Sequence, residues 1–182
     1  MSGRRTSRRR GPRPISTERA LTAGERTLVA HVFGAAIDPA PVRVRRAKWW
    51  MWQPAWVTMA PDGHLWFHPN GRDWSEDFSD APLSSRGHFL HEMVHVWQHQ
   101  QGVNLRLRRH PFMRYAYLPL APGKPFSAYN PEQQAEIVRE AWTIAEGWNL
   151  PGRPPLEAYR ALLPFASPLV QGRGKGSSSA TR

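Results

Sequence analysis

The sequence predicts one α+β domain, in which a small antiparallel or mixed sheet packs on two amphipathic helices. Short segments rich in aromatic and β-branched residues, bounded by turn residues, occupy 42–68 and predict strands. Apolar residues then recur at helical spacing in 84–102 and again in 131–148. A chain of 182 residues, of which 40% are hydrophobic, is long enough to bury one core.

The positive charge is concentrated at the two ends of the chain. Of the formal net charge of +11, residues 1–20 contribute six charges and residues 171–182 contribute three. Neither end carries enough apolar residues to fold on its own. We therefore predict a disordered arginine-rich arm at 1–20, a single folded domain at 21–168 and a disordered Gly/Ser tail at 169–182.

Composition also limits the chemistry and the location. The chain has no cysteine, so disulfides and thiolate metal sites are excluded and metal ligands must be His, Asp or Glu. It has no long apolar run of the kind that a membrane span or a secretory signal requires. We therefore expect a cytoplasmic protein without membrane contact, whose export, if any, follows a non-classical route.

The first half of the domain is predicted as a helix followed by strands. Thr22 and Glu25 form a capping box before an amphipathic helix at Ala23–Ala36. Val42–Arg45 alternates as a half-buried strand does, and Trp56–Met59 with His64–His68 indicates a β-hairpin. We expect the tryptophan cluster at 49–52 to pack on the core; a base-stacking platform is the less favoured alternative.

The second half is predicted as mostly helical. Ser84 or Ser85 can cap a helix that ends near Gly102. Asn130 is the N-cap of another helix, with Pro131 at its first position and Gln133 three residues after the cap, as in a capping box. A last short helix is expected at 156–163.

The helix at 84–102 carries the pattern His91-Glu92-x-x-His95. Residues four apart lie on one face of a helix, so His91 and His95 can bind the same zinc ion. Glu92 is offset by one position and can accept a proton from a water molecule at the metal. The sequence thus predicts Zn²⁺ as cofactor, although a solvated histidine face would show the same spacing.

A catalytic zinc ion needs a third protein ligand from elsewhere in the chain. The candidates are His99, His110, Glu132, Glu136 and Glu140. A carboxylate in the first two turns of the helix after Asn130 is the economical choice. Interaction with the helix dipole explains Glu132 better than Glu136, but helical geometry alone does not select between them.

Several segments together resemble a bacterial family. They are Phe89–Gln98, Tyr115-x-Tyr117, Gly123-Lys124-x-Phe126 and Tyr129-Asn130-x-Glu132 continuing to Val138. These blocks are similar to Vgr-related zinc metallopeptidase domains, some of which are fused to the C-terminus of type VI secretion spike proteins. The similarity extends over about residues 21–148. The spike domain is absent from this chain, and the arginine-rich arm is not explained by the resemblance.

The resemblance implies a zincin-like fold and a set of site residues. It implies His91, His95 and Glu136 as zinc ligands and Glu92 as the general base of peptide hydrolysis, with a peptide or protein as substrate. Among the tyrosines that could stabilise the oxyanion, Tyr129 is favoured over Tyr115 and Tyr117 because it precedes the helix of Glu136.

Two further interpretations concern substrate and function class. A strand at Leu65–Phe67 could pair with an extended substrate as an edge strand. The alternatives to a peptidase are a zincin-like binding or structural module whose metal only stabilises the fold, and a nucleic-acid-associated protein recruited by the arginine-rich arm.

Overall fold

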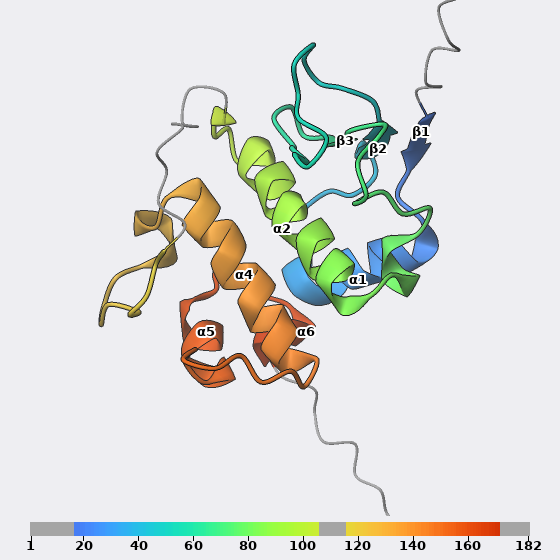
Figure 1. The fold of residues 1–182 in the computed structure, drawn as a ribbon. Helices are drawn as coiled ribbons and strands as arrows, with labels where there is room; N and C mark the ends of the chain where they lie inside the picture. The colour runs from blue at the N-terminus through green and yellow to red at the C-terminus, as the bar shows by residue number, and fades with distance from the viewer. Residues whose placement is uncertain (1–16, 106–115, 172–182) are drawn as a thin grey trace, which may run out of the picture.

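The computed structural model describes residues 17–105 and 116–171, which form a small sheet and a set of helices (Figure 1). In chain order the elements are β1 (Thr17–Ala20), α1 (Ala23–Phe33), β2 (Arg43–Arg46), β3 (Leu65–Phe67), a 3-10 turn (Phe78–Asp80), α2 (Leu83–Gln100), a second 3-10 turn (Phe126–Ala128), α4 (Pro131–Ala145), α5 (Leu156–Leu162) and α6 (Pro168–Gln171). The predicted α+β class is confirmed.

The sheet is mixed and has the strand order β1-β2-β3. The central strand β2 pairs antiparallel with β1 and parallel with β3. Val44 of β2 and Leu65 of β3 are fully buried, so the sheet rests its apolar face on the helices. A parallel pair needs a crossover, and here the connection is the loop of residues 47–64.

β1 corrects the predicted domain boundary. The predicted disordered arm includes Thr17–Ala20, but these residues form a strand whose register pairs Thr17 with Arg46. Residues 169–171, assigned to the tail, belong to α6. Pairing with a strand more than 20 residues away leaves no local signal, which is why the boundary was missed. The rest of the arm and of the tail lies outside the described residues.

The predicted β-hairpin is present only as a remnant. Met59 and Trp66 exchange two backbone hydrogen bonds of 3.2 and 2.8 Å in a single antiparallel bridge. β3 otherwise pairs with β2, so the hairpin prediction is wrong beyond this bridge. The backbone N–H and C=O of Trp66 on the side away from β2 are already hydrogen-bonded to Met59. The strand Leu65–Phe67 therefore has no open edge at Trp66, contrary to the expected pairing with substrate.

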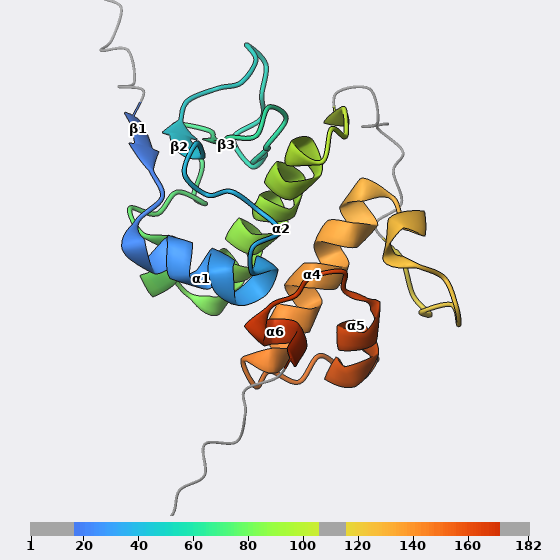
Figure 2. The ribbon, with the colours of Figure 1, turned by 180° about the vertical axis from the view of Figure 1, so that it is seen from behind.

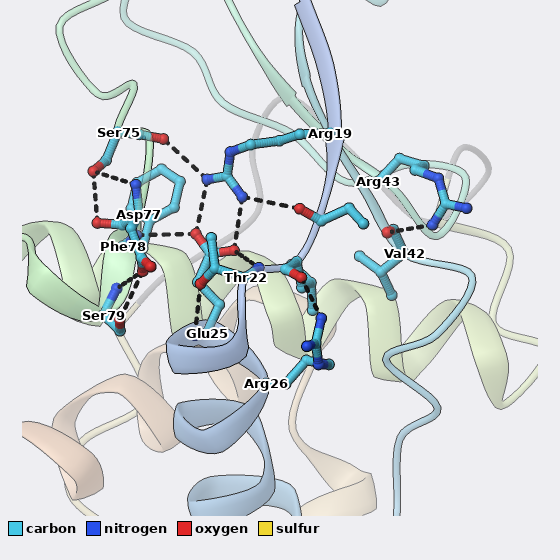
Figure 3. A network of polar contacts seen from close by, with 12 residues as sticks. Arg19, Thr22, Glu25, Arg26, Val42, Arg43, Ser75, Asp77, Phe78 and Ser79 are labelled. Atoms are coloured by element: carbon cyan, nitrogen blue, oxygen red, sulfur yellow. Dashed lines mark hydrogen bonds and ion pairs between the residues drawn. The ribbon is translucent and has the colours of Figure 1, made fainter.

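The start of α1 confirms the predicted capping box (Figure 3). The amide of Glu25 donates to the Thr22 hydroxyl, and the Glu25 carboxylate accepts from the Thr22 amide at 2.9 Å. The same fully buried carboxylate accepts two bonds from Arg19 of β1, at 2.7 and 2.8 Å, and one from the Phe78 amide at 2.9 Å. Glu25 therefore joins β1, α1 and the turn before α2.

α2 begins differently from the prediction. Its N-cap is Pro82, which has no side chain to accept a hydrogen bond, and the helix starts at Leu83. Ser84 and Ser85 lie inside the first turn, so their predicted capping role is wrong. The predicted end near Gly102 is confirmed within two residues, and Gly102 has φ of +79°, a conformation that favours glycine.

α2 and α4 run side by side and form the centre of the molecule, as both views show (Figures 1 and 2). Phe89, Leu90 and Met93 of α2 and Ile137 and Val138 of α4 are fully buried. α5 packs against α4, and α6 packs against α1 and α5 (Figure 2).

Candidate metal centre

Three side chains meet between α2 and α4 in an arrangement that could hold a metal ion. His91 and His95 come from α2, one turn apart, and Glu132 comes from the first turn of α4. Glu132 Oε2 lies 3.3 Å from His91 Nε2 and 3.4 Å from His95 Nε2. Within the described part of the chain these three offer ligand atoms that all lie within 4.8 Å of one another.

Two of the three spacings agree with those of a tetrahedral zinc site. Ligand atoms about 2.0–2.1 Å from a zinc ion in a tetrahedron lie roughly 3.3 Å from one another. The two distances from Glu132 Oε2, 3.3 and 3.4 Å, agree with that spacing. Two imidazoles and one carboxylate also form a donor set that zinc accepts in hydrolytic enzymes. The donor set and these two distances therefore fit a metal ion.

His95 is held in a defined orientation by Gln98. His95 is fully buried, and its Nδ1 lies 2.9 Å from Gln98 Oε1, so Nδ1–H donates to the amide oxygen. The same amide donates from Nε2 to the Pro131 carbonyl at 3.0 Å and to Gln134 Oε1 at 2.8 Å. His95 Nε2 is left buried and without a hydrogen-bond partner among the described residues, as a metal-binding nitrogen would be.

The position of Glu132 follows from the local structure at the start of α4. The Gln133 amide donates to Asn130 Oδ1 at 2.9 Å, and Gln133 Oε1 accepts from the Asn130 amide at 3.1 Å, which completes the predicted capping box. Gln98 of α2 connects the two helices at this turn by donating a hydrogen bond to the carbonyl of Pro131. The next residue, Glu132, is thereby placed above His91 and His95, and its side chain is buried.

Glu136, which the resemblance implied as the third ligand, lies one turn further along α4. Arg139 donates two hydrogen bonds to its carboxylate, and His91 Nδ1 lies 3.6 Å from Glu136 Oε2. Burial alone would raise the pKa of Glu136, but Arg139 and His91 hold it well below its usual range. The structure thus places Glu132 beside the two Nε2 atoms, and Glu136 on the other nitrogen of His91.

His91 is therefore bracketed by two carboxylates. Burial lowers the pKa of its imidazole, but hydrogen bonding to Glu132 and Glu136 outweighs this effect and raises the pKa to about 9. Glu132 lies beside Nε2 of His91, the nitrogen that faces the candidate metal site. Glu136 lies beside Nδ1 and is positioned to orient the ring. A carboxylate behind a metal-binding histidine is a common arrangement, because it fixes the ring and strengthens the ligand.

Glu92 is a buried carboxylate with incomplete hydrogen bonding among the described residues. It lies on α2 between the two histidines and is only 3% exposed. Its Oε2 atom is buried and has no hydrogen-bond partner in the described residues. A buried carboxylate oxygen without a partner is costly to keep in a folded protein, so an interaction with a ligand or solvent molecule is the expected compensation.

The remaining predicted residues have other surroundings. Glu140 is buried among Tyr117, Tyr159 and Arg153, away from the cluster. Burial and the hydrogen bond to Glu140 raise the pKa of the Tyr117 hydroxyl well above its usual range. This hydroxyl is part of the buried network around Glu140. His110 and Tyr115 lie outside the described residues, and His99 is exposed at the end of α2.

Tyr129 is buried, and its hydroxyl has no hydrogen-bond partner in the part of the chain that the structure describes. The Lys124 ammonium lies 4.0 Å from the centre of its ring. An unpaired hydroxyl is compatible with the predicted role at the oxyanion, which stays a prediction. Sequence reasoning missed Gln98; its only signal was a polar residue three positions after His95 on an otherwise buried helix face.

Comparisons with known proteins identify relatives of this chain. No family model matches. The type VI secretion system spike protein VgrG2b of Pseudomonas aeruginosa is 44% identical over 130 residues, which are 67% of this chain and 13% of that protein. The solved effector domain of P. aeruginosa VgrG2b is 38% identical, with a TM-score of 0.61 over 75% of this chain and 79% of that domain. The chain belongs to the family of the VgrG2b effector domain.

Proposed function

We propose that this protein is a zinc-dependent peptidase whose ion is bound by His91, His95 and Glu132. The observation that carries the proposal is the buried cluster of these side chains next to a buried carboxylate, Glu92, that has no protein partner among the described residues. A metal that only stabilised the fold would not need that carboxylate. The pattern His-Glu-x-x-His on a helix is the one that hydrolytic zinc sites use.

The protein's own groups divide the work of hydrolysis. When bound, zinc supplies a Lewis acid that polarises the scissile carbonyl and lowers the pKa of water. Glu92 accepts the proton of the attacking water and returns it to the leaving amine. Gln98 holds the His95 ring, and Glu136 orients His91. Tyr129 is the proposed additional donor to the oxyanion.

The relatives extend the proposal to a biological setting. VgrG2b is a spike protein of the type VI secretion system, and the solved relative is its effector domain. We propose that this chain likewise acts as an effector on a peptide or protein substrate outside the cell that makes it. No helix among the described residues is long and apolar enough to cross a membrane.

The decisive experiment measures zinc content and peptide hydrolysis on the same samples. Glu92→Gln should keep one zinc ion per chain and lose hydrolysis, and His95→Ala should lose both. His99→Ala is the matched control, because His99 lies one turn further along the same helix and is exposed. Hydrolysis retained by Glu92→Gln, or zinc retained by His95→Ala, would refute the proposal.

A second pair of variants separates the two candidate third ligands. Glu132→Gln should lower zinc affinity more than Glu136→Gln, because Glu132 alone lies next to both Nε2 atoms. The reverse order would restore Glu136 as the ligand. Competition with a chromophoric chelator measures both affinities without depending on a substrate.

A further inference from the structure

An exposed apolar loop lies on the connection between β2 and β3. Four of the five large apolar side chains that are exposed in the described residues belong to it: Trp50, Met51, Trp52 and Trp56, with exposures of 46, 70, 73 and 81%. The sequence predicts that the cluster at 49–52 packs on the core. The prediction is wrong, because Trp50, Met51 and Trp52 are exposed. Trp49 is half-buried and packs on Trp66, which is also half-buried and lies outside the core, with the two ring centres 5.0 Å apart.

The loop is held in shape by a buried glutamine. Gln53 is 2% exposed, and its Oε1 accepts from the Trp49 amide at 2.7 Å. Its Nε2 donates to the Val57 carbonyl at 2.7 Å, and its own amide donates to the Trp50 carbonyl. One buried side chain thus joins both ends of the turn. The tryptophans are displayed by a fixed backbone, which lowers the entropy that a binding event would cost.

Basic residues flank the loop on its β2 side. Residues 39–61 contain Arg43, Arg45, Arg46 and Lys48 and no acidic residue. Arg45 is paired with Glu18 and Asp62. The hydrogen bonds of the other three go to backbone carbonyls, which do not cancel their charge. The base of the loop is therefore positively charged and its tip is apolar.

The tip also carries polar groups suited to an interface with water. The indole N–H groups of Trp50, Trp52 and Trp56 have no acceptor among the described residues. The ring centres of Trp50 and Trp52 lie 6.5 Å apart in an edge arrangement. Tryptophan prefers the headgroup region of a bilayer, where its ring is buried and its N–H bonds to a lipid oxygen. Both views show the connection rising clear of the sheet (Figures 1 and 2).

We infer that residues 47–57 dock on the surface of a bilayer that contains anionic lipid. The order along the loop matches the profile of such a surface, because basic side chains meet phosphates and indoles enter the interface below them. A projecting apolar tip suits a deformable lipid surface. A protein partner would need a matching concave pocket. Attachment would be peripheral, and it is independent of the peptidase activity.

The test uses the full-length protein and sedimentation with lipid vesicles. Wild type should bind vesicles of phosphatidylcholine with about 30% phosphatidylglycerol more tightly than vesicles of phosphatidylcholine alone, because each basic residue near the surface adds attraction. Trp52→Ser with Trp56→Ser should weaken binding about tenfold for each tryptophan removed. Brominated lipids should quench the fluorescence of wild type more than that of the double variant.

The matched control is Trp148→Ser, which removes an exposed tryptophan at the end of α4 and should bind vesicles as wild type does. All these proteins keep the arginine-rich N-terminus, so a difference between them reports on the loop. Lys48→Gln provides a second test that leaves the tryptophans in place, and it should weaken binding to anionic vesicles only. Absence of wild-type binding, as expected for a loop that serves a protein partner, or equal binding by the double variant, would overturn the inference.

Discussion

Glu92 and Glu140 are both buried carboxylates on adjacent helices, and their surroundings are opposite. Glu140 is 1% exposed and receives hydrogen bonds from Tyr117, from Tyr159 at 2.9 Å and from Arg153 at 2.7 Å. Glu92 is 3% exposed and has an oxygen with no partner in the described residues. Burial alone therefore does not separate the structural carboxylate Glu140 from Glu92, the proposed catalytic base. The completeness of their hydrogen bonding does.

The comparison predicts the largest effect on stability at Glu140. Glu140→Ala should lower the free energy of unfolding by about 3–5 kcal/mol, because it leaves two buried hydroxyls without their acceptor. Chemical denaturation of the metal-free protein measures it. Glu157→Ala, at an exposed site on α5, is the control and should stay within about 0.5 kcal/mol. A loss below about 1 kcal/mol at Glu140 would show that its network is not structural.

The next effect concerns metal affinity and the amide of Gln98. Gln98→Leu should lower zinc affinity about 10–100-fold, as losses of groups that orient a ligand do. Gln98→Glu should recover only part of the affinity, because its carboxylate accepts from His95 Nδ1–H but cannot donate to the Pro131 carbonyl and Gln134 Oε1. Gln101→Leu, at an exposed position just after α2, is the control. Equal affinities for Gln98→Leu and wild type would show that Gln98 does not orient His95.

A smaller effect, of opposite sign, is expected at Glu92. Glu92→Gln should raise the free energy of unfolding of the metal-free protein by about 1 kcal/mol, because a neutral amide costs less to bury than an unpaired carboxylate. Thermal unfolding of the metal-free protein detects the change. A destabilised Glu92→Gln variant would place Glu92 in the same structural class as Glu140.

The smallest effect is a pH dependence of zinc binding. The pKa of His91 is raised to about 9 in the metal-free protein, so its imidazole carries a proton at pH 7 that zinc must displace. Apparent affinity should therefore increase with pH up to about 9. Titrations of zinc at several pH values measure it. In Glu136→Gln, the increase should stop at a lower pH; a flat profile between pH 7 and 9 in wild type would contradict the assignment.

Local signals predicted the parts of this molecule that local structure determines. The capping boxes at Thr22 and Asn130 and the spacing of His91 and His95 each depend on residues a few positions apart, and all are confirmed. The choice between Glu132 and Glu136 depends on how α4 crosses α2, which the Gln98–Pro131 hydrogen bond helps to set. That contact joins residues far apart in the chain, so it leaves no periodic pattern in the sequence from which it could be predicted.

The same distinction explains the errors in the sheet and in the loop. β1 exists because it pairs with β2, and its four residues carry no strand pattern of their own. The tryptophans at 50–56 have the composition of a core segment, and only the tertiary structure shows that Gln53 turns them outward. Composition predicts that a segment can be buried, but not which surface or partner buries it.

The position of Glu132 and Glu140 on one helix has a consequence for metal starvation. The start of α4 is joined to α2 through the candidate metal site and the Gln98 amide, whereas its later turns are fixed by the tyrosines and Arg153 around Glu140. A chelator should therefore loosen the first turns of α4, seen as faster amide exchange there, and leave the later turns protected. Loss of the metal ion would therefore affect the order of the first turns of α4 only, because the later turns are fixed by other contacts.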